Sequence, residues 1–147
     1  MKIAQQAFDA VRAHGAEGYP NEICGVLVGP RGTRTATAAK RARNIVGQPG
    51  SLQPELGSER TRDRYEIDPR DQIRIQREAD ASGDDIIGYY HSHPDHPAQA
   101  SATDAKRAYS GYVYLIVSVA HGEPVDANAF VTDNDGGPFH SEPLEVF

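Results

Sequence analysis

The chain has 147 residues, with 15 lysines and arginines against 21 aspartates and glutamates, which gives a formal net charge of −6 at pH 7. That length suits one domain with a substantial buried core, and we expect a single domain over residues 1–147. The acidic balance, together with the lack of a long run of basic residues, argues against nucleic acid as a partner.

The single cysteine, Cys24, excludes an internal disulfide and a cysteine-rich structural zinc site. Any metal ion must therefore be held by histidines and carboxylates. The first residues lack the apolar run of a signal peptide, and no stretch approaches the roughly 18 apolar residues of a membrane span. We therefore expect a cytoplasmic protein that makes no contact with a membrane.

The first third of the chain predicts a helix followed by a hairpin. Apolar residues at near-helical spacing indicate the helix, and a continuous apolar run is typical of a strand buried on both faces. The next segment alternates small or β-branched residues with charged ones, which favours a second, antiparallel strand. In chain order, these elements are a helix over about 3–14 with Gly15, Gly18 and Pro20 as helix stops, a strand over 23–28, a turn at 29–32 and a strand over 33–43.

The middle of the chain predicts a loop, a short strand and a second helix. Residues 47–62 carry glycine, proline and charge without apolar periodicity, so we expect a long mobile loop, and such loops are often functional. Residues 65–67 resemble a short strand. Asp68 is a candidate N-cap, because Pro69 follows it at the first helical position. The predicted helix runs from about 69 to 81 and ends before a glycine at 83.

The last part of the chain predicts three further strands and a short helix. Two prolines after the strand over 86–90 indicate that the chain leaves the sheet there and forms a loop. The complete order predicts an α/β fold, in which a mixed β-sheet is flanked by helices. The remaining elements are a helix from about 101 to 109, buried strands over 113–119 and 125–131, and an edge segment over 138–147.

Two histidines at the end of the strand over 86–90 carry the strongest chemical signal. His91 and His93 stand two residues apart, so in extended backbone both imidazoles project to the same side. Asp104 lies in the first turn of the next predicted helix, which returns the chain toward them. Two imidazoles and one carboxylate suit Zn²⁺ and leave a fourth tetrahedral position open. The spacing therefore predicts a catalytic zinc site.

A zinc site that hydrolyses a bond also needs a group that moves protons. Glu22 is a candidate, because it directly precedes a buried strand and is therefore expected at a sheet end. From the residues alone, Glu66 and Asp68 qualify equally well. Ser101 is a candidate donor to the oxyanion that develops on the attacked carbonyl. Taken singly, Ser101 and Asp104 are also explained as caps of the helix.

Taken together, these residues resemble the JAMM (MPN-type) metalloproteases. Glu22, then His91-Ser92-His93-Pro94, then Ser101 and Asp104 reproduce the pattern of that family without a departure. The segments over 21–29 and 111–119 are also similar to compact bacterial members. The resemblance implies a cytidine-deaminase-like α/β/α fold, with His91, His93 and Asp104 as zinc ligands. It also implies Glu22 as general acid and base, and Ser101 as the residue that stabilises the tetrahedral intermediate.

The resemblance also implies a class of substrate. Family members cleave peptide or isopeptide bonds after the Gly-Gly tail of ubiquitin or ubiquitin-like proteins, and compact bacterial members resemble enzymes that trim small sulfur-carrier proteins. We therefore expect a zinc peptidase or isopeptidase whose partner is such a protein. The arginines of the loop over 47–62, together with Arg64, are candidates to bind an acidic carrier or its terminal carboxylate. Cell-wall peptides are an alternative substrate.

Other functions are weaker interpretations of the same residues. A non-catalytic MPN scaffold would keep the fold but lose ligands, and here every ligand is present. Cys24 as a nucleophile conflicts with its position inside a predicted buried strand. A zinc nucleobase deaminase needs a pair of cysteine ligands, which one cysteine cannot supply. His96 is a spare ligand, a substrate contact or a polar loop residue.

Overall fold

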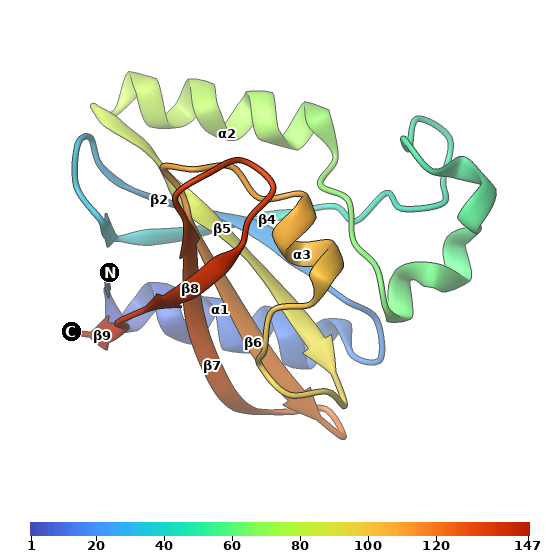
Figure 1. The fold of residues 1–147 in the computed structure, drawn as a ribbon. Coiled ribbons are helices and arrows are strands. Elements are labelled where there is room, and N and C mark those ends of the chain that lie inside the picture. The colour runs from blue at the N-terminus through green and yellow to red at the C-terminus, as the bar shows by residue number, and fades with distance from the viewer.

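The protein is described by a computed structural model over residues 1–57 and 59–147. Its centre is a mixed six-stranded sheet (Figure 1). Only β5 and β6 run parallel within it, and the other neighbouring strands of this sheet run antiparallel. In spatial order, the strands are β4 (Ala38–Ala42), β2 (Cys24–Pro30), β5 (Asp84–Pro94), β6 (Val113–Ala120), β7 (Glu123–Thr132) and β8 (Phe139–Glu142).

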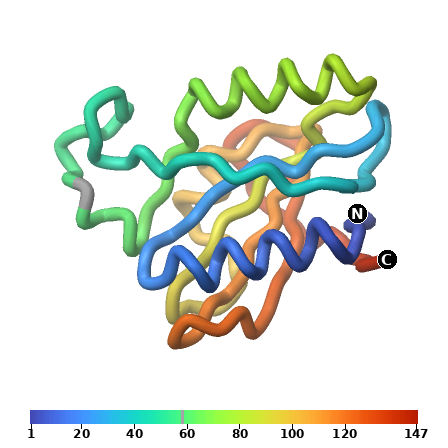
Figure 2. Tube along the Cα trace, turned by 180° about the vertical axis from the view of Figure 1, so that it is seen from behind, coloured from blue at the N-terminus to red at the C-terminus, as the bar shows by residue number. Residues whose placement is uncertain are grey.

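A helix covers each face of this sheet. α1 (Gln5–Gly18) packs on one face, where its buried Val11 joins Leu27 and Val117 in the larger core cluster. α2 (Pro69–Ala81) packs on the other face, where its Ile75 joins a second cluster. Figure 2 shows α1 from the opposite side, running across the sheet strands. The mixed sheet with helices on both faces confirms the predicted α/β fold class.

Shorter elements complete the fold. A small second sheet has parallel pairs, in the order β3 (Thr35–Ala36), β1 (Lys2–Ile3) and β9 (Glu145–Val146). Two 3₁₀ helices, η1 (Pro54–Leu56) and η2 (Ser58–Arg62), lie between β4 and α2, and α3 (Ala102–Lys106) lies between β5 and β6. Among the described residues, no helix is both long enough and apolar enough to cross a membrane.

The structure corrects several predicted boundaries. The first helix begins at Gln5, because Lys2 and Ile3 form a strand, and it continues through Gly15 to Gly18. A glycine suits position 15 because the helix lies close to the sheet there. An added Cβ would come 3.0 Å from a methyl group of Val119, which is a tight contact. The helix beginning at Pro69 has the predicted bounds, and the carboxylate of Asp68 caps it by accepting from the Arg70 N–H.

Three other predicted segments differ from the structure in the kind of element they form. Residues 65–67 form no strand and contribute one isolated bridge, between Asn44 and Ile67. The segment over 33–43 splits into β3 and β4, which pair in different sheets. The loop over 47–62 is not free of secondary structure, since it contains η1 and η2. Such short elements depend on tertiary contacts and leave little periodicity in the sequence.

The strand expected to stop at residue 90 continues to Pro94. Its parallel pairing with β6 extends through His91 and His93, which lie opposite Ile116 and Ser118. Pro94 is the last residue of this strand, where a missing N–H is tolerated. The two histidines therefore project from a sheet strand rather than from a loop.

Candidate active site

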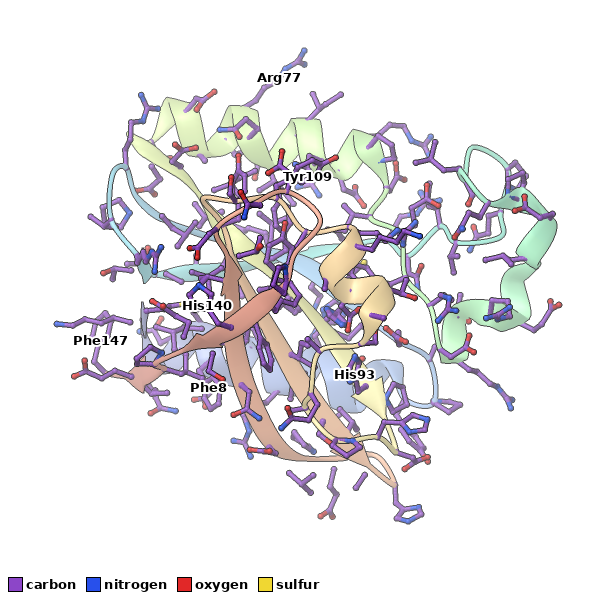
Figure 3. All side chains as sticks on the ribbon, in the orientation of Figure 1. Phe8, Arg77, His93, Tyr109, His140 and Phe147 are labelled. Atoms are coloured by element: carbon purple, nitrogen blue, oxygen red, sulfur yellow. The ribbon has the colours of Figure 1, made fainter. Side chains whose placement is uncertain are left out.

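The two histidines belong to the carboxyl-terminal end of β5, with 5.0 Å between their ring centroids, and Figure 3 shows His93 there. His91 is buried, with 1% of its surface exposed. The Nε2 atoms of His91 and His93 are 3.1 Å apart. His93 Nδ1 lies 2.9 Å from the carbonyl oxygen of Pro97, an acceptor, so Nδ1 carries a proton and Nε2 is the ring nitrogen that can bind a metal ion when His93 is neutral. The strand geometry thus aims both Nε2 atoms at one point.

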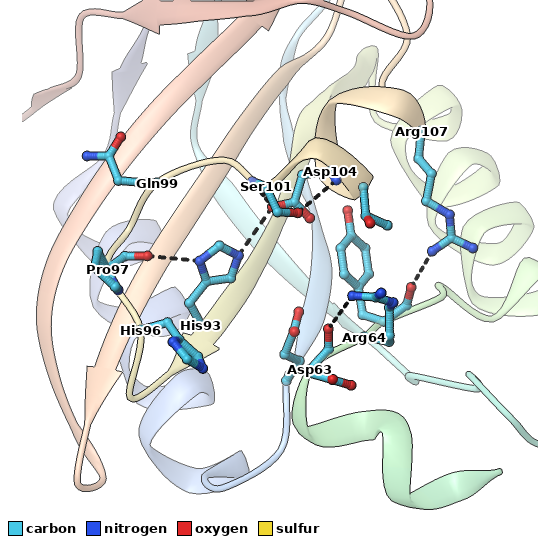
Figure 4. Close-up of a pocket in the computed structure, with 12 residues that line it drawn as sticks. Asp63, Arg64, His93, His96, Pro97, Gln99, Ser101, Asp104 and Arg107 are labelled. Carbon is cyan, nitrogen blue, oxygen red and sulfur yellow. Dashed lines mark hydrogen bonds and ion pairs between the residues drawn. The ribbon is translucent and has the colours of Figure 1, made fainter. Parts of the chain in front are cut away.

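A capping box brings Asp104 to the same point. The Ser101 hydroxyl accepts from the Asp104 N–H (3.0 Å), and the Ser101 N–H donates to Asp104 Oδ2 (2.9 Å). The two carboxylate oxygens lie 3.2 Å from the Nε2 atoms of His91 and His93. Figure 4 shows Asp104 and Ser101 facing His93 across the pocket. The cap that starts α3 therefore also orients its carboxylate toward the imidazoles.

The electrostatics of the three groups match a site for a cation. Burial opposes the ionisation of Asp104, but hydrogen bonds from both imidazoles hold its pKa well below the usual range. Burial lowers the pKa of His91, which favours its neutral form. Burial also lowers the pKa of His93, but its bonds to Asp104 and the Pro97 carbonyl outweigh this effect and raise it. An ionised carboxylate beside an imidazole that favours its neutral form suits a metal ion.

The distances between these donor atoms also fit a metal ion. Zn–N distances of about 2.0–2.1 Å in a tetrahedral site separate the ligand atoms by roughly 3.3–3.4 Å. The separations among His91, His93 and Asp104 are 3.1–3.2 Å. Glu22 is the other acidic neighbour, and donor atoms of Glu22, His91 and His93 all lie within 4.8 Å of one another. Because the distances to Asp104 are shorter, Asp104 fits a ligand position better than Glu22.

Strand pairing places Glu22 at this site. β2 runs antiparallel to β5 with Cys24 opposite His91, so Glu22, two residues before Cys24, lies level with His93. Glu22 has 7% of its surface exposed. Burial raises its pKa to about 8, an effect that the charge of His93 opposes and that of Asp104 reinforces. A carboxylate with a pKa near neutrality can both take up and release a proton.

The two carboxylates that seemed equivalent to Glu22 in the sequence are engaged elsewhere. Glu66 accepts hydrogen bonds from the Ser51 hydroxyl (2.7 Å) and from the Leu52 N–H. Asp68 caps α2 and pairs with Arg70 at 3.1 Å. Both carboxylates therefore stabilise local structure away from the histidines, which leaves Glu22 as the candidate for proton transfer.

A cleft of about 250 Å³ opens over the site. Arg64 and His96 contribute to its walls, and neither a helix nor a strand contains them. His96 is therefore a cleft residue. Cys24, in contrast, is completely buried. Burial raises the pKa of its thiol, which disfavours the thiolate that a nucleophile needs. The residues that line the cleft are Glu22, Asp63, Arg64, Tyr65, His93, His96, Pro97, Gln99, Ser101, Thr103, Asp104 and Arg107.

Tyr65 is a candidate site residue that the sequence did not reveal. Its ring stacks on the imidazole of His91, with 4.3 Å between centroids and 22° between planes. Its carbonyl oxygen accepts a hydrogen bond from Arg107 Nη1 at 2.7 Å (Figure 4). The aromatic ring therefore covers a face of His91. Tyr65 stands outside the metal motif, so its only signal was its place after the long loop.

Comparison with known proteins identifies the family. A family model described as "Prokaryotic homologs of the JAB domain" matches residues 4–132. The chain belongs to this family. The match spans Glu22, both histidines, Ser101 and Asp104, so the residues that converge in the cleft all lie within the family domain.

Two curated proteins are similar over most of the chain. A protein of Haloferax volcanii named "Desampylase" is 39% identical over 123 residues, which cover 80% of each chain. A "CysO-cysteine peptidase" of Mycobacterium tuberculosis is 30% identical over 108 residues, which cover 74% of this chain and 65% of that protein.

Solved structures agree with the fold. Protein DSY2949 of Desulfitobacterium hafniense has a TM-score of 0.76 at 26% identity and covers all of this chain and 93% of its own. AF2198 of Archaeoglobus fulgidus, a JAB1/MPN domain protein, has a TM-score of 0.57 at 16% identity, with coverage of 100% and 96%. The second likeness shows the fold alone, and it confirms the predicted JAMM/MPN architecture.

Proposed function

We propose that this protein is a zinc-dependent peptidase or isopeptidase that cleaves after the Gly-Gly tail of a ubiquitin-like or sulfur-carrier protein. Family membership and the two named relatives support a hydrolase that acts on such proteins. The observation that carries the zinc site is the convergence of two Nε2 atoms and one carboxylate within 3.1–3.2 Å. The proposal includes the cytoplasmic location expected from the sequence.

In this proposal, His91, His93 and Asp104 hold the zinc ion. When bound, zinc supplies a Lewis acid that activates water and polarises the carbonyl of the scissile bond. Glu22 would be ionised beside the positive charge of a bound ion, despite the effect of its burial. Glu22 takes the proton of the attacking water and delivers it to the leaving amine. The hydroxyl of Ser101 donates a hydrogen bond to the oxyanion that develops on the attacked carbonyl.

The surroundings of the cleft suit a protein substrate. Arg64 lines the cleft and supplies positive charge for an acidic carrier or its carboxylate, as the sequence suggested. A second hollow shares Tyr65 and Arg107 with the cleft. Its lining includes Leu52 and Tyr109, whose exposed fractions are 84% and 60%. Exposed apolar groups beside a catalytic cleft are typical of a surface that binds another protein, and we assign this hollow to the body of the carrier.

The test combines metal content with cleavage. The purified protein is analysed for zinc and incubated with a Gly-Gly-terminated sulfur-carrier protein extended by one residue. We expect one zinc ion per chain, and cleavage that is lost in Glu22→Gln but retained in the control Glu78→Gln, which changes an exposed carboxylate on α2. Zinc binding without cleavage would support the metal site but would contradict the proposal that a sulfur-carrier protein is the substrate. A chain that binds no zinc after reconstitution would refute the enzyme and favour a binding scaffold.

A further inference from the structure

Asn44, just after β4, connects two parts of the cleft through its side-chain amide. Nδ2 donates to the carbonyl oxygens of Glu22 (3.1 Å) and Arg64 (3.0 Å). Oδ1 accepts from the N–H groups of Val46 (3.2 Å) and Glu66 (3.0 Å). An asparagine amide offers two N–H donors and two lone pairs on oxygen, so these four bonds use its full capacity. Because the partners are two carbonyls and two N–H groups, they also determine which way round the amide lies.

The first connection holds the backbone of Glu22. Its carbonyl is bound by Asn44, and its N–H donates to the carbonyl oxygen of Thr61 at 2.6 Å. Glu22 precedes β2, so the ladder with β5 does not include it. The side chain of Asn44 and the segment that ends η2 therefore supply the hydrogen bonds that fix the peptide groups on either side of its Cα. The position of the carboxylate over His93 depends on them.

The second connection brackets Tyr65. The Arg64 carbonyl and the Glu66 N–H belong to the two peptide groups that flank the Cα of Tyr65, and Asn44 binds both. Arg107 binds the carbonyl of Tyr65 from the other side. These contacts fix the backbone from which the Tyr65 ring projects onto His91. One amide thus holds the backbone of the proposed acid and base and the backbone of the residue that covers a proposed ligand.

We propose that Asn44 is a positioning residue for catalysis: it holds Glu22 and Tyr65 at fixed places relative to His91 and His93. This inference rests on the proposed function, and it adds a residue outside the metal motif. Proton transfer is sensitive to displacements of about 1 Å, which can cost on the order of 100-fold in rate. Loss of the Asn44 contacts should therefore lower the rate of the chemical step while the metal ligands stay in place.

The decisive variant is Asn44→Asp, which keeps the shape and the acceptor but points an oxygen at the carbonyls of Glu22 and Arg64. We expect kcat to fall by at least about tenfold, with zinc content unchanged and KM within about threefold. The matched control is Gln48→Glu, the same amide-to-carboxylate change in the same loop. Among the described contacts, the side-chain amide of Gln48 bonds only to the backbone carbonyl of Asn44 (3.3 Å) and makes no bond to Glu22 or Tyr65, so kcat should stay at the wild-type value.

A second measurement needs neither metal nor substrate. A ring stacked on His91 shields the carbon-bound protons of that imidazole, so their NMR signals in the metal-free protein should lie upfield. Tyr65→Leu gives the reference value without the stack. We expect Asn44→Asp to move the His91 signals toward this reference, and Gln48→Glu to leave them unchanged. This measurement decides the role of Asn44 even where the wild-type protein does not cleave the carrier.

A purely structural role predicts a different result. A folded Asn44→Asp protein that unfolds at a lower temperature but keeps the wild-type kcat and His91 signals would overturn the proposal. A rise in KM at unchanged kcat would also overturn it, because it would place the effect on substrate binding. If Asn44→Asp does not fold, Asn44→Ser carries the same two measurements, since its hydroxyl retains one donor for the two carbonyls.

Discussion

A buried histidine away from the cleft makes the stability of this protein depend on pH. His14 of α1 has 9% of its surface exposed, and its Nδ1 lies 2.8 Å from the Tyr90 hydroxyl. Burial, assisted by the charge of Arg41, lowers the pKa of His14 from 6.5 to about 4, and Glu17 only partly offsets this. Replacement by asparagine removes the titrating group, and its side-chain amide retains a partner for the Tyr90 hydroxyl.

The sign and size of the effect follow from this shift. Between pH 6.5 and pH 4, His14 is protonated in the unfolded chain but neutral in the folded one. The unfolded state binds more protons there, so the free energy of unfolding falls as the pH falls. A shift of this size corresponds to at most about 3 kcal/mol. Screening by solvent and by the exposed Arg41–Glu17 pair reduces the expected effect to about 1–2 kcal/mol.

Urea unfolding of the metal-free protein at about pH 7.5 and at about pH 4.5 measures this effect. The wild-type protein should lose about 1–2 kcal/mol more stability than His14→Asn on acidification. Carboxylates that titrate in the same window are present in both proteins and cancel in the difference. Equal losses in the two proteins would refute the reasoning, and a larger loss in the variant would reverse its sign.

Four further predictions concern the cleft and its support. Asp104→Asn should weaken zinc binding by more than about 100-fold in competition with a chelator, since it removes a charged ligand. Ser101→Ala should lower kcat by about 10²–10³-fold and the free energy of unfolding by about 1 kcal/mol, whereas Ser101→Thr should retain part of both. Leu52→Asp should raise KM for the carrier protein at unchanged kcat. Gly25→Ala should lower the free energy of unfolding by about 1–3 kcal/mol in urea, because the new methyl group would overlap the ring of Tyr90.

The parts of the fold that were predicted correctly are those with strong local signals. Long apolar runs gave β2 and β6, and the Asp-Pro start gave α2 with its observed bounds. The three short strands of the second sheet were missed or merged with other segments. Each has two residues, and their pairing joins segments as distant as Lys2 and Glu145, which no local pattern encodes.

The site residues also differ in whether local sequence spacing or tertiary structure brings them together. His91 and His93 share a strand, and Asp104 follows after a short loop, so spacing alone indicated that they converge. Glu22 has no such constraint, and its place beside them follows from the register between β2 and β5. The stack of Tyr65 on His91 depends equally on tertiary structure. Strand register and loop contacts are therefore the information that the sequence pattern lacked.

The proposed metal ligands and Glu22 are held in place by different parts of the fold. The proposed ligands depend on β5 and on one capping box, both supported by the core and by local hydrogen bonds. Glu22 depends on contacts beyond the end of its strand, among them those to Asn44 and the carbonyl of Thr61. Changes that loosen the segment between β4 and α2 should therefore impair proton transfer before they impair metal binding. A protein that holds zinc but turns over slowly is the expected first stage of such damage.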